Sequence, residues 1–148
     1  MKYFITTFGC QANAADSEKT AEIMENLGYD CADNAEDLIS AKNPVLIFNT
    51  CSVRQKAEDR VFGLNNKLQQ LKIINCKLKI VLTGCMTHYG KDELNKRLPF
   101  FDHFIDIKNI AKLKKILKTK SARPAASNLP RRTSAPRRTS ALIPISNG

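Results

Sequence analysis

The sequence contains no apolar run that approaches the ~18 residues needed to span a membrane. Its N-terminus, MKYFITTFGC, also lacks the long apolar stretch and the small-residue cleavage site of a secretory signal. Both absences argue against a membrane protein or a secreted one, so we expect a cytoplasmic protein with no membrane partner. Because 43% of the 148 residues are hydrophobic, the chain can bury one core, which favours one globular domain.

Acidic residues are absent beyond Asp106, whereas residues 108–148 hold 11 of the 24 lysines and arginines. The net charge of +10 therefore belongs to the last expected helix and to the segment after it. That segment is rich in Pro, Ser, Ala and Arg, and it repeats PRRTSA at 130–135 and 136–141. Such a composition buries too little apolar surface to offset the entropy of ordering. We expect a folded domain over 1–117 and a flexible basic linker over 118–148, which either stays solvated or contacts RNA phosphates.

Four apolar runs have the continuous β-branched and aromatic content of buried parallel strands. They are residues 2–8, 44–49, 78–83 and 103–107, and YDCA near Tyr29 could add a short edge strand. Between and after them lie helical patterns at 16–28, 53–71, 91–98 and 109–117. This alternation predicts an α/β fold: an open parallel sheet of four to five strands with helices on both faces.

The ends of the first two helices carry recognisable signals. Asp16 or Ser17 is the expected N-cap of the first helix, and Gly28 is its expected stop. Ser52 with Gln55 forms a potential capping box at the start of the second helix. The second pattern continues without a break, so it predicts one long helix.

Five cysteines are an odd number, and in a reducing compartment thiols serve more often as ligands, catalysts or core residues than as disulfides. Cys10, Cys51 and Cys85 each follow one of the first three main strands, in the loop that leads towards the next helix. In a parallel sheet such loops all open on the carboxyl edge, where α/β sheets bind their ligands. We therefore expect these three thiols to form a metal site, and we expect Cys31 and Cys76 to be structural.

Several interpretations of this site stay open. A cysteine after a strand is often an ordinary small buried residue. Zinc is a second candidate, because His88 would complete a Cys3His set, although zinc sites usually use close ligand pairs and only Cys85 and His88 are close in sequence. An iron–sulfur cluster with one iron left without a protein ligand fits three dispersed cysteines better. The other histidine, His103, is expected on the surface or in a loop.

A nucleotide or flavin at the same edge is a further alternative. The sequence contains neither a G-x-G-x-x-G loop nor a G-x-x-x-x-G-K-[ST] loop, so phosphate recognition lacks its usual motif. A zinc-binding or nucleotide-binding α/β module with a basic RNA-binding tail therefore remains the second interpretation of the chain.

Three segments carry a closer resemblance: TFGCQANAADSE at 7–18, NTCSVR at 49–54 and LTGCM at 82–86. In this order and at these intervals they resemble the N-terminal domain of the radical-SAM methylthiotransferases, from residue 2 to about 117. NTCSVR is most similar to the MiaB-like branch, the tRNA 2-methylthio-N6-isopentenyladenosine synthases, rather than to the RimO branch, which modifies a ribosomal protein. Other residues match motif positions without an assignable role: Gln11, Asn13, Asp16, Asn49 and Arg54.

The resemblance implies that Cys10, Cys51 and Cys85 hold an auxiliary [4Fe–4S] cluster on a parallel α/β domain. For a complete enzyme it implies insertion of a methylthio group at C2 of the isopentenyl-modified adenosine beside the tRNA anticodon. S-adenosylmethionine and a second [4Fe–4S] cluster would belong to a radical-SAM domain. The anticodon stem-loop would be the partner of a monomeric protein, and the resemblance identifies neither the sulfur donor nor the electron donor.

The chain also departs from the family. Ala12 stands where the family has methionine in Gln-Met-Asn, a small change in packing. The Cys-x3-Cys-x2-Cys motif of the radical-SAM domain is missing, and ALIPISNG at 141–148 resembles the segment just before its first cysteine. We therefore expect a fragment or an interrupted reading frame, which holds the auxiliary cluster, has no catalytic residue of its own and is inactive alone.

Overall fold

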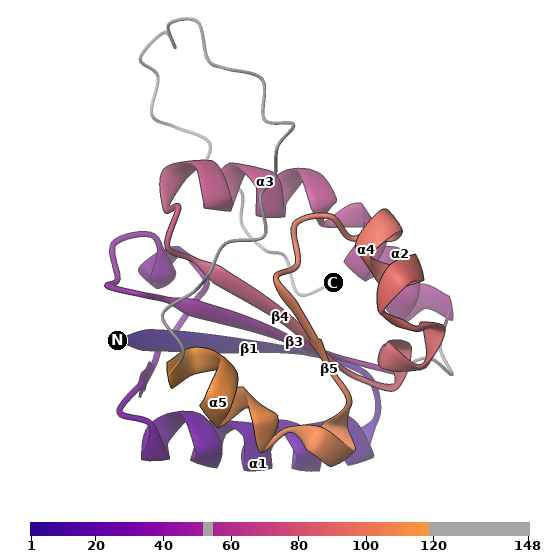
Figure 1. Ribbon diagram of the computed structural model, residues 1–148, viewed down its shortest axis with the longest axis horizontal. Coiled ribbons are helices and arrows are strands. Elements are labelled where there is room, and N and C mark those ends of the chain that lie inside the picture. The colour runs from indigo at the N-terminus through magenta and orange to yellow at the C-terminus, as the bar shows by residue number, and fades with distance from the viewer. Residues whose placement is uncertain (52–54, 119–148) are drawn as a thin grey trace, which may run out of the picture.

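The computed structural model describes residues 1–51 and 55–118. At its centre lies a parallel sheet with the strand order β2-β1-β3-β4-β5 (Figure 1). The strands are β1 (Lys2–Phe8), β2 (Asp30–Cys31), β3 (Val45–Thr50), β4 (Lys79–Gly84) and β5 (His103–Ile105). The predicted α/β class, the four main strands and the short edge strand near Tyr29 are confirmed.

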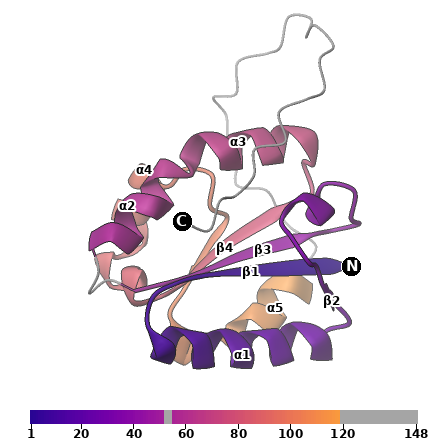
Figure 2. The same ribbon diagram turned by 180° about the vertical axis from the view of Figure 1, so that it is seen from behind.

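Helices cover both faces of the sheet, as Figures 1 and 2 show from opposite sides. One face carries α1 (Gln11–Asn26) and α5 (Lys112–Lys118), and the other carries α2 (Gln55–Gly63), α3 (Asn65–Ile74) and α4 (Lys91–Arg97). Shorter 3₁₀ turns are η1 (Glu36–Leu38), η2 (Cys85–Tyr89) and η3 (Ile107–Asn109). Within the described ranges, no helix has the length and apolar character needed to cross a membrane.

The sheet separates two apolar cores, because alternate residues of its strands face opposite sides. One core lies under α2, α3 and α4 and includes Leu46, Phe48, Ile80, Leu82, Val61, Leu68, Leu94 and Leu98. The other lies under α1 and α5 and includes Tyr3, Val45, Ile47, Val81, Ile105, Met24 and Leu113. Since β3 is buried along its whole length, the strand is apolar on both faces until it reaches Asn49 and Thr50.

The start of the first helix differs from the prediction. α1 begins at Gln11, upstream of the expected N-cap at Asp16 or Ser17, so that prediction was wrong. The buried side of the helix changes character along its length, from Asn13 in the first turn to Met24 near the end. A polar buried side leaves no apolar periodicity, so the first half of α1 carries no helix signal of the usual kind.

The single helix predicted over 53–71 is two helices, α2 and α3, which meet at Leu64. Gly63 ends α2 and is a weak helix former. The Leu64 N–H donates to the Val61 carbonyl at 3.1 Å, which tightens the turn at the junction. The apolar period crosses this bend because both helices pack into the same core.

The remaining predictions divide in three ways. Gly28 follows α1 with a φ of +81°, as expected for the residue that ends a helix, and the two later helices are present with slightly different bounds.

The prediction that His103 lies on the surface or in a loop was wrong. His103 begins β5 and is half-buried, and this burial lowers the pKa of its imidazole. The capping box at Ser52 lies outside the described residues, and so does the basic linker expected over 118–148 apart from Lys118, which ends α5.

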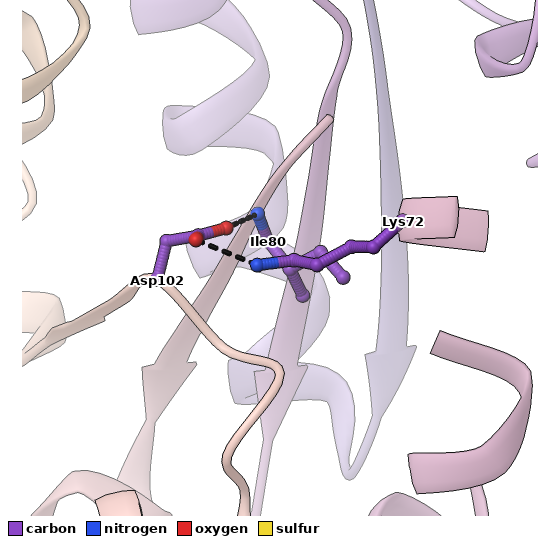
Figure 3. A network of polar contacts seen from close by, with 3 residues as sticks. All are labelled: Lys72, Ile80 and Asp102. Carbon is purple, nitrogen blue, oxygen red and sulfur yellow. Dashed lines mark hydrogen bonds and ion pairs between the residues drawn. The ribbon is translucent and has the colours of Figure 1, made fainter. Parts of the chain in front are cut away.

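Asp102, just before β5, fastens β4 to α3 (Figure 3). Its carboxylate accepts a hydrogen bond from the Ile80 N–H at 2.7 Å and pairs with Lys72 Nζ at 2.6 Å. The Asp102 N–H in turn donates to the Ile80 carbonyl at 2.8 Å. Asp102 thereby continues the pairing between β4 and β5 to the residue before β5. Its ion pair with Lys72 also connects these strands to α3 on the face of the sheet.

Replacing Asp102 with Ala should lower the free energy of unfolding by about 1–3 kcal/mol, because the Ile80 N–H and the partly buried Lys72 would both lose their partner. Urea unfolding followed by circular dichroism measures this loss. Asp33→Ala is the matched control, since Asp33 is exposed, and it should change stability by less than about 0.5 kcal/mol. Equal effects of the two substitutions would contradict the role given to Asp102.

Candidate metal centre

Three cysteines lie at the carboxyl ends of three neighbouring strands. Cys51 directly follows β3, Cys85 directly follows β4, and Cys10 is the N-cap residue of α1 just after β1. The register pairs the last residue of β1 with that of β3, and the last residue of β3 with that of β4. The Cys51 N–H also donates to the Phe8 carbonyl at 2.9 Å, so the pairing continues one residue past the end of β3. The structure therefore brings all three segments to one edge.

The three side chains do not converge on one point. In residues 1–51 and 55–118, no three His, Cys, Asp or Glu side chains are grouped so that they could hold a metal ion. Cys51 is buried, whereas Cys10 and Cys85 are exposed, and none of the five cysteines, all of them described, forms a disulfide. Coordination of one metal centre by these thiols would therefore require side-chain rotation on a backbone that already holds the segments side by side.

The other two cysteines lie away from this edge. Cys31 ends β2 and pairs with Tyr3, near the amino end of β1. Cys76 lies between α3 and β4, before the amino end of β4. Both are exposed, so neither fills the core. Cys31 lies beside the amino half of β1 and Cys76 precedes β4, so neither lies at the three-cysteine edge.

The cysteine edge coincides with the point where the chain changes face. After β1 the chain enters α1 on one face of the sheet, whereas after β3 it reaches α2 on the opposite face (Figures 1 and 2). Open α/β sheets bind ligands in the crevice between two such adjacent strands. Cys10 and Cys51 follow the two adjacent strands, β1 and β3, from which the chain leaves towards opposite faces.

Two buried asparagines join the first two cysteine segments. Asn13 lies in the first turn of α1, and its Oδ1 accepts from the Cys10 N–H at 3.3 Å and from Cys10 Sγ at 3.4 Å. Its Nδ2 donates to Asn49 Oδ1 at 3.1 Å and to the Thr50 carbonyl at 3.3 Å. Asn49 Nδ2 donates back to the Asn13 carbonyl at 2.7 Å and to Ser17 Oγ at 2.9 Å. The start of α1 and the end of β3 are thus held together by satisfied buried amides.

Glycines precede two of the three cysteines, and both pack against this amide pair. A Cβ at Gly9 would overlap the side chain of Asn13. Gly84 has a φ of +95°, and a Cβ there would overlap the Thr50 carbonyl and lie 2.7 Å from Asn49 Oδ1. Close approach of the three segments therefore depends on the missing side chains at these positions.

The turn η2, which begins at Cys85, is attached to α2 by a tyrosine. Tyr89 OH donates to both carboxylate oxygens of Glu58 at 3.0 and 3.2 Å, and Glu58 is only 3% exposed. The hydrogen bond to Glu58 raises the pKa of Tyr89 above its ordinary value, so the phenol keeps the proton that it donates. His88 Nδ1 lies 2.6 Å from the Cys85 carbonyl, which leaves only Nε2 for the zinc ligation considered above.

The sequence motifs identified some of these residues and missed others. Asn13 and Asn49 matched motif positions, and the structure now gives them contacts, while Arg54 lies outside the described residues. Ser17 was missed as a site residue, although its Oγ contacts Asn49 and also lies 2.7 Å from Thr7 Oγ1. The repeated Gly-Cys pair at Cys10 and Cys85 was the available signal for the close packing of the segments.

An apolar pocket of about 90 Å³ lies elsewhere, on the sheet face beneath α3, and Phe8, Phe48, Leu68 and Leu71 are among its lining residues. Typical small-molecule sites measure roughly 300–1,000 Å³. The pocket is too small for a nucleotide and is lined by no cysteine, so it is distinct from the cysteine edge at which a nucleotide was considered.

Gly84→Ala should lower the free energy of unfolding by at least about 2 kcal/mol, because Ala is strained at this positive φ and its Cβ would push into β3. Gly63→Ala is the matched control: nothing lies within 4 Å of a Cβ there. The control should leave stability unchanged or raise it by up to about 1 kcal/mol. Urea unfolding of both variants tests this difference, and a Gly84→Ala variant as stable as the control would contradict the packing described.

Comparison with known proteins places the chain in a family. Residues 2–106 match the family described as "Uncharacterized protein family UPF0004". Curated relatives include the tRNA-2-methylthio-N(6)-dimethylallyladenosine synthases of Dictyoglomus thermophilum, 42% identical over 112 residues, and of Hydrogenobaculum sp., 39% identical over 110 residues. These matches cover 76% and 74% of this chain but 24% of each relative, so the chain spans about a quarter of the length of the relatives it matches. Because the family match covers well over half of the chain, the protein belongs to UPF0004, as the resemblance of its three cysteine motifs to the N-terminal domain of methylthiotransferases predicted.

Proposed function

We propose that this chain is the cluster-binding N-terminal unit of a tRNA methylthiotransferase and that Cys10, Cys51 and Cys85 hold a [4Fe–4S] cluster. The observation that carries this proposal is the common ending of β1, β3 and β4, which places three cysteines at adjacent strand ends. The names of the relatives supply the enzyme class, since they are synthases of a methylthiolated tRNA nucleoside.

The donor set suits an iron–sulfur cluster. Thiolates are the usual ligands of such clusters, and three of them leave one iron without a protein ligand. Cys10 lies at the N-terminus of α1, where the helix dipole favours a negatively charged sulfur. When bound, the cluster would supply an iron that can take up and release sulfur. This chain's own residues would hold that cluster and orient it at the edge of the sheet.

The complete reaction requires more than this domain. We propose that the substrate is the isopentenyl-modified adenosine beside the tRNA anticodon, which would receive a methylthio group at C2. S-adenosylmethionine and a second [4Fe–4S] cluster would act in a radical-SAM domain. The exposed lysines of η3 and α5 support contact with RNA phosphates: Lys108, Lys112, Lys114, Lys115 and Lys118.

Anaerobic reconstitution of the whole chain with iron and sulfide tests the cluster. We expect about four irons and four sulfides per chain, because that is the content of a [4Fe–4S] cluster. Cys10→Ala, Cys51→Ala and Cys85→Ala should each lose most of this iron and its EPR signal after reduction. Cys31→Ala and Cys76→Ala are matched controls and should retain both. Retention of the cluster by any of the first three variants, or no cluster on the wild-type chain, would refute the proposed site.

His88→Ala separates the cluster from the zinc alternative. A cluster on three cysteines should survive this substitution with unchanged iron content, because His88 contributes no ligand to it. Zinc titration of the same variant provides the second measurement. Tight zinc binding by the wild-type chain that is lost in His88→Ala, together with no iron uptake, would favour a Cys3His zinc site.

A further inference from the structure

We propose that Asn13 is a positioning residue for the cysteine site, which fixes the backbone of Cys10 relative to the Cys51 and Cys85 segments. The proposal rests on the proposed function, because it assigns to Asn13 a task in binding the cluster. Asn13 is 3% exposed and hydrogen-bonded through both polar atoms of its amide.

The orientation of this amide is fixed by its surroundings. The Cys10 N–H can only donate, so the atom of Asn13 that faces it must be the oxygen. The Thr50 carbonyl can only accept, so the atom that faces it must be the nitrogen. A flipped amide would lose both bonds in a buried site, where an unsatisfied polar group is costly. The rigid, planar amide of Asn13 therefore fixes the distance between the start of α1 and the end of β3.

The third segment is coupled to the same group through contact. Gly84, directly before Cys85, lies against the Thr50 carbonyl and Asn49 Oδ1, the two acceptors of Asn13 Nδ2. A displacement of either acceptor would therefore move into, or away from, the backbone that leads to Cys85. One amide thus influences the placement of all three cysteine segments, and its hydrogen bonds to Cys10 attach it directly to one of them.

The two contacts of Asn13 Oδ1 with Cys10 respond differently to metal binding. A cysteine coordinates iron as a thiolate, which has no proton to donate to an oxygen. The contact between Cys10 Sγ and Asn13 Oδ1 at 3.4 Å therefore belongs to the metal-free chain. The bond from the Cys10 N–H at 3.3 Å does not involve the sulfur and can persist. Asn13 thereby retains the backbone of Cys10 when the side chain turns to the metal.

Two substitutions separate positioning from simple stabilisation. Asn13→Asp keeps an acceptor for the Cys10 N–H but replaces Nδ2 with an oxygen that faces the Thr50 carbonyl and Asn49 Oδ1. Asn13→Ser is neutral and too short to bridge the two segments. Asn26→Asp is the matched control, because it makes the same chemical change at an exposed position of α1.

Each variant of the whole chain would be tested for cooperative urea unfolding without metal, and then for iron and sulfide content and for the midpoint potential of the reconstituted cluster. We expect at least one Asn13 variant to unfold cooperatively and yet to hold less than about half of the wild-type iron. We expect any cluster that it does hold to have a shifted midpoint potential, because altered cysteine placement and hydrogen bonding change the cluster environment. The control should match the wild-type chain in all three measurements.

Wild-type iron content and an unchanged potential in both Asn13 variants would overturn the positioning role, even if their stability fell. Loss of cooperative unfolding in both variants would also overturn it, because Asn13 would then serve the fold as a whole rather than the site. Failure of the wild-type chain to take up a cluster is a different result: it would reject the proposed function itself, before any Asn13 variant is compared.

Discussion

The constraint on which the rest depends is the parallel register of β1, β3 and β4, which end at the same level. A nearly continuous apolar strand such as β3 specifies its register weakly through burial alone, since both of its faces are covered. Asn49 removes this ambiguity. A shift of one residue would turn its amide away from Asn13 and towards the apolar core that contains Phe48. The buried asparagine pair therefore selects the register, and the register sets where Cys51 lies.

The same pair explains the uneven character of α1. The sheet-facing side of the helix is polar where it covers the strand ends, at Asn13 and Ser17, and apolar where it covers the core, at Met24. A helix that was apolar throughout would pack more simply, but it could not satisfy the Thr50 carbonyl at the edge of the sheet. The polarity of α1 thus follows the distance from the site, and the apolar core under its second half stabilises the close, glycine-dependent packing near its first turn.

Much of this arrangement could be predicted from the sequence, for identifiable reasons. The strands were found because continuous β-branched and aromatic runs are the signal of buried parallel strands, and the common edge of the cysteines followed from parallel topology alone. The first turn of α1 was missed because tertiary hydrogen bonds, rather than an apolar period, hold Asn13 against the sheet. The bend at Leu64 was missed because the apolar pattern runs through it. Contacts such as that of Gly84 with Thr50 depend on strands distant in sequence, which local patterns do not reveal.

The exposure of the three cysteines is itself consistent with a site that exchanges a ligand. Cys51 is 5% exposed, and its N–H is hydrogen-bonded to the Phe8 carbonyl of β1, whereas Cys10 and Cys85 are exposed to solvent. Three equally buried thiols would shield a bound metal from any substrate. Three equally exposed thiols would leave the metal without a ligand that the surrounding structure holds in place. One buried and two exposed positions combine a fixed attachment with access from solvent. This asymmetry agrees with the proposed function, in which a cluster held by these three cysteines would take up and release sulfur.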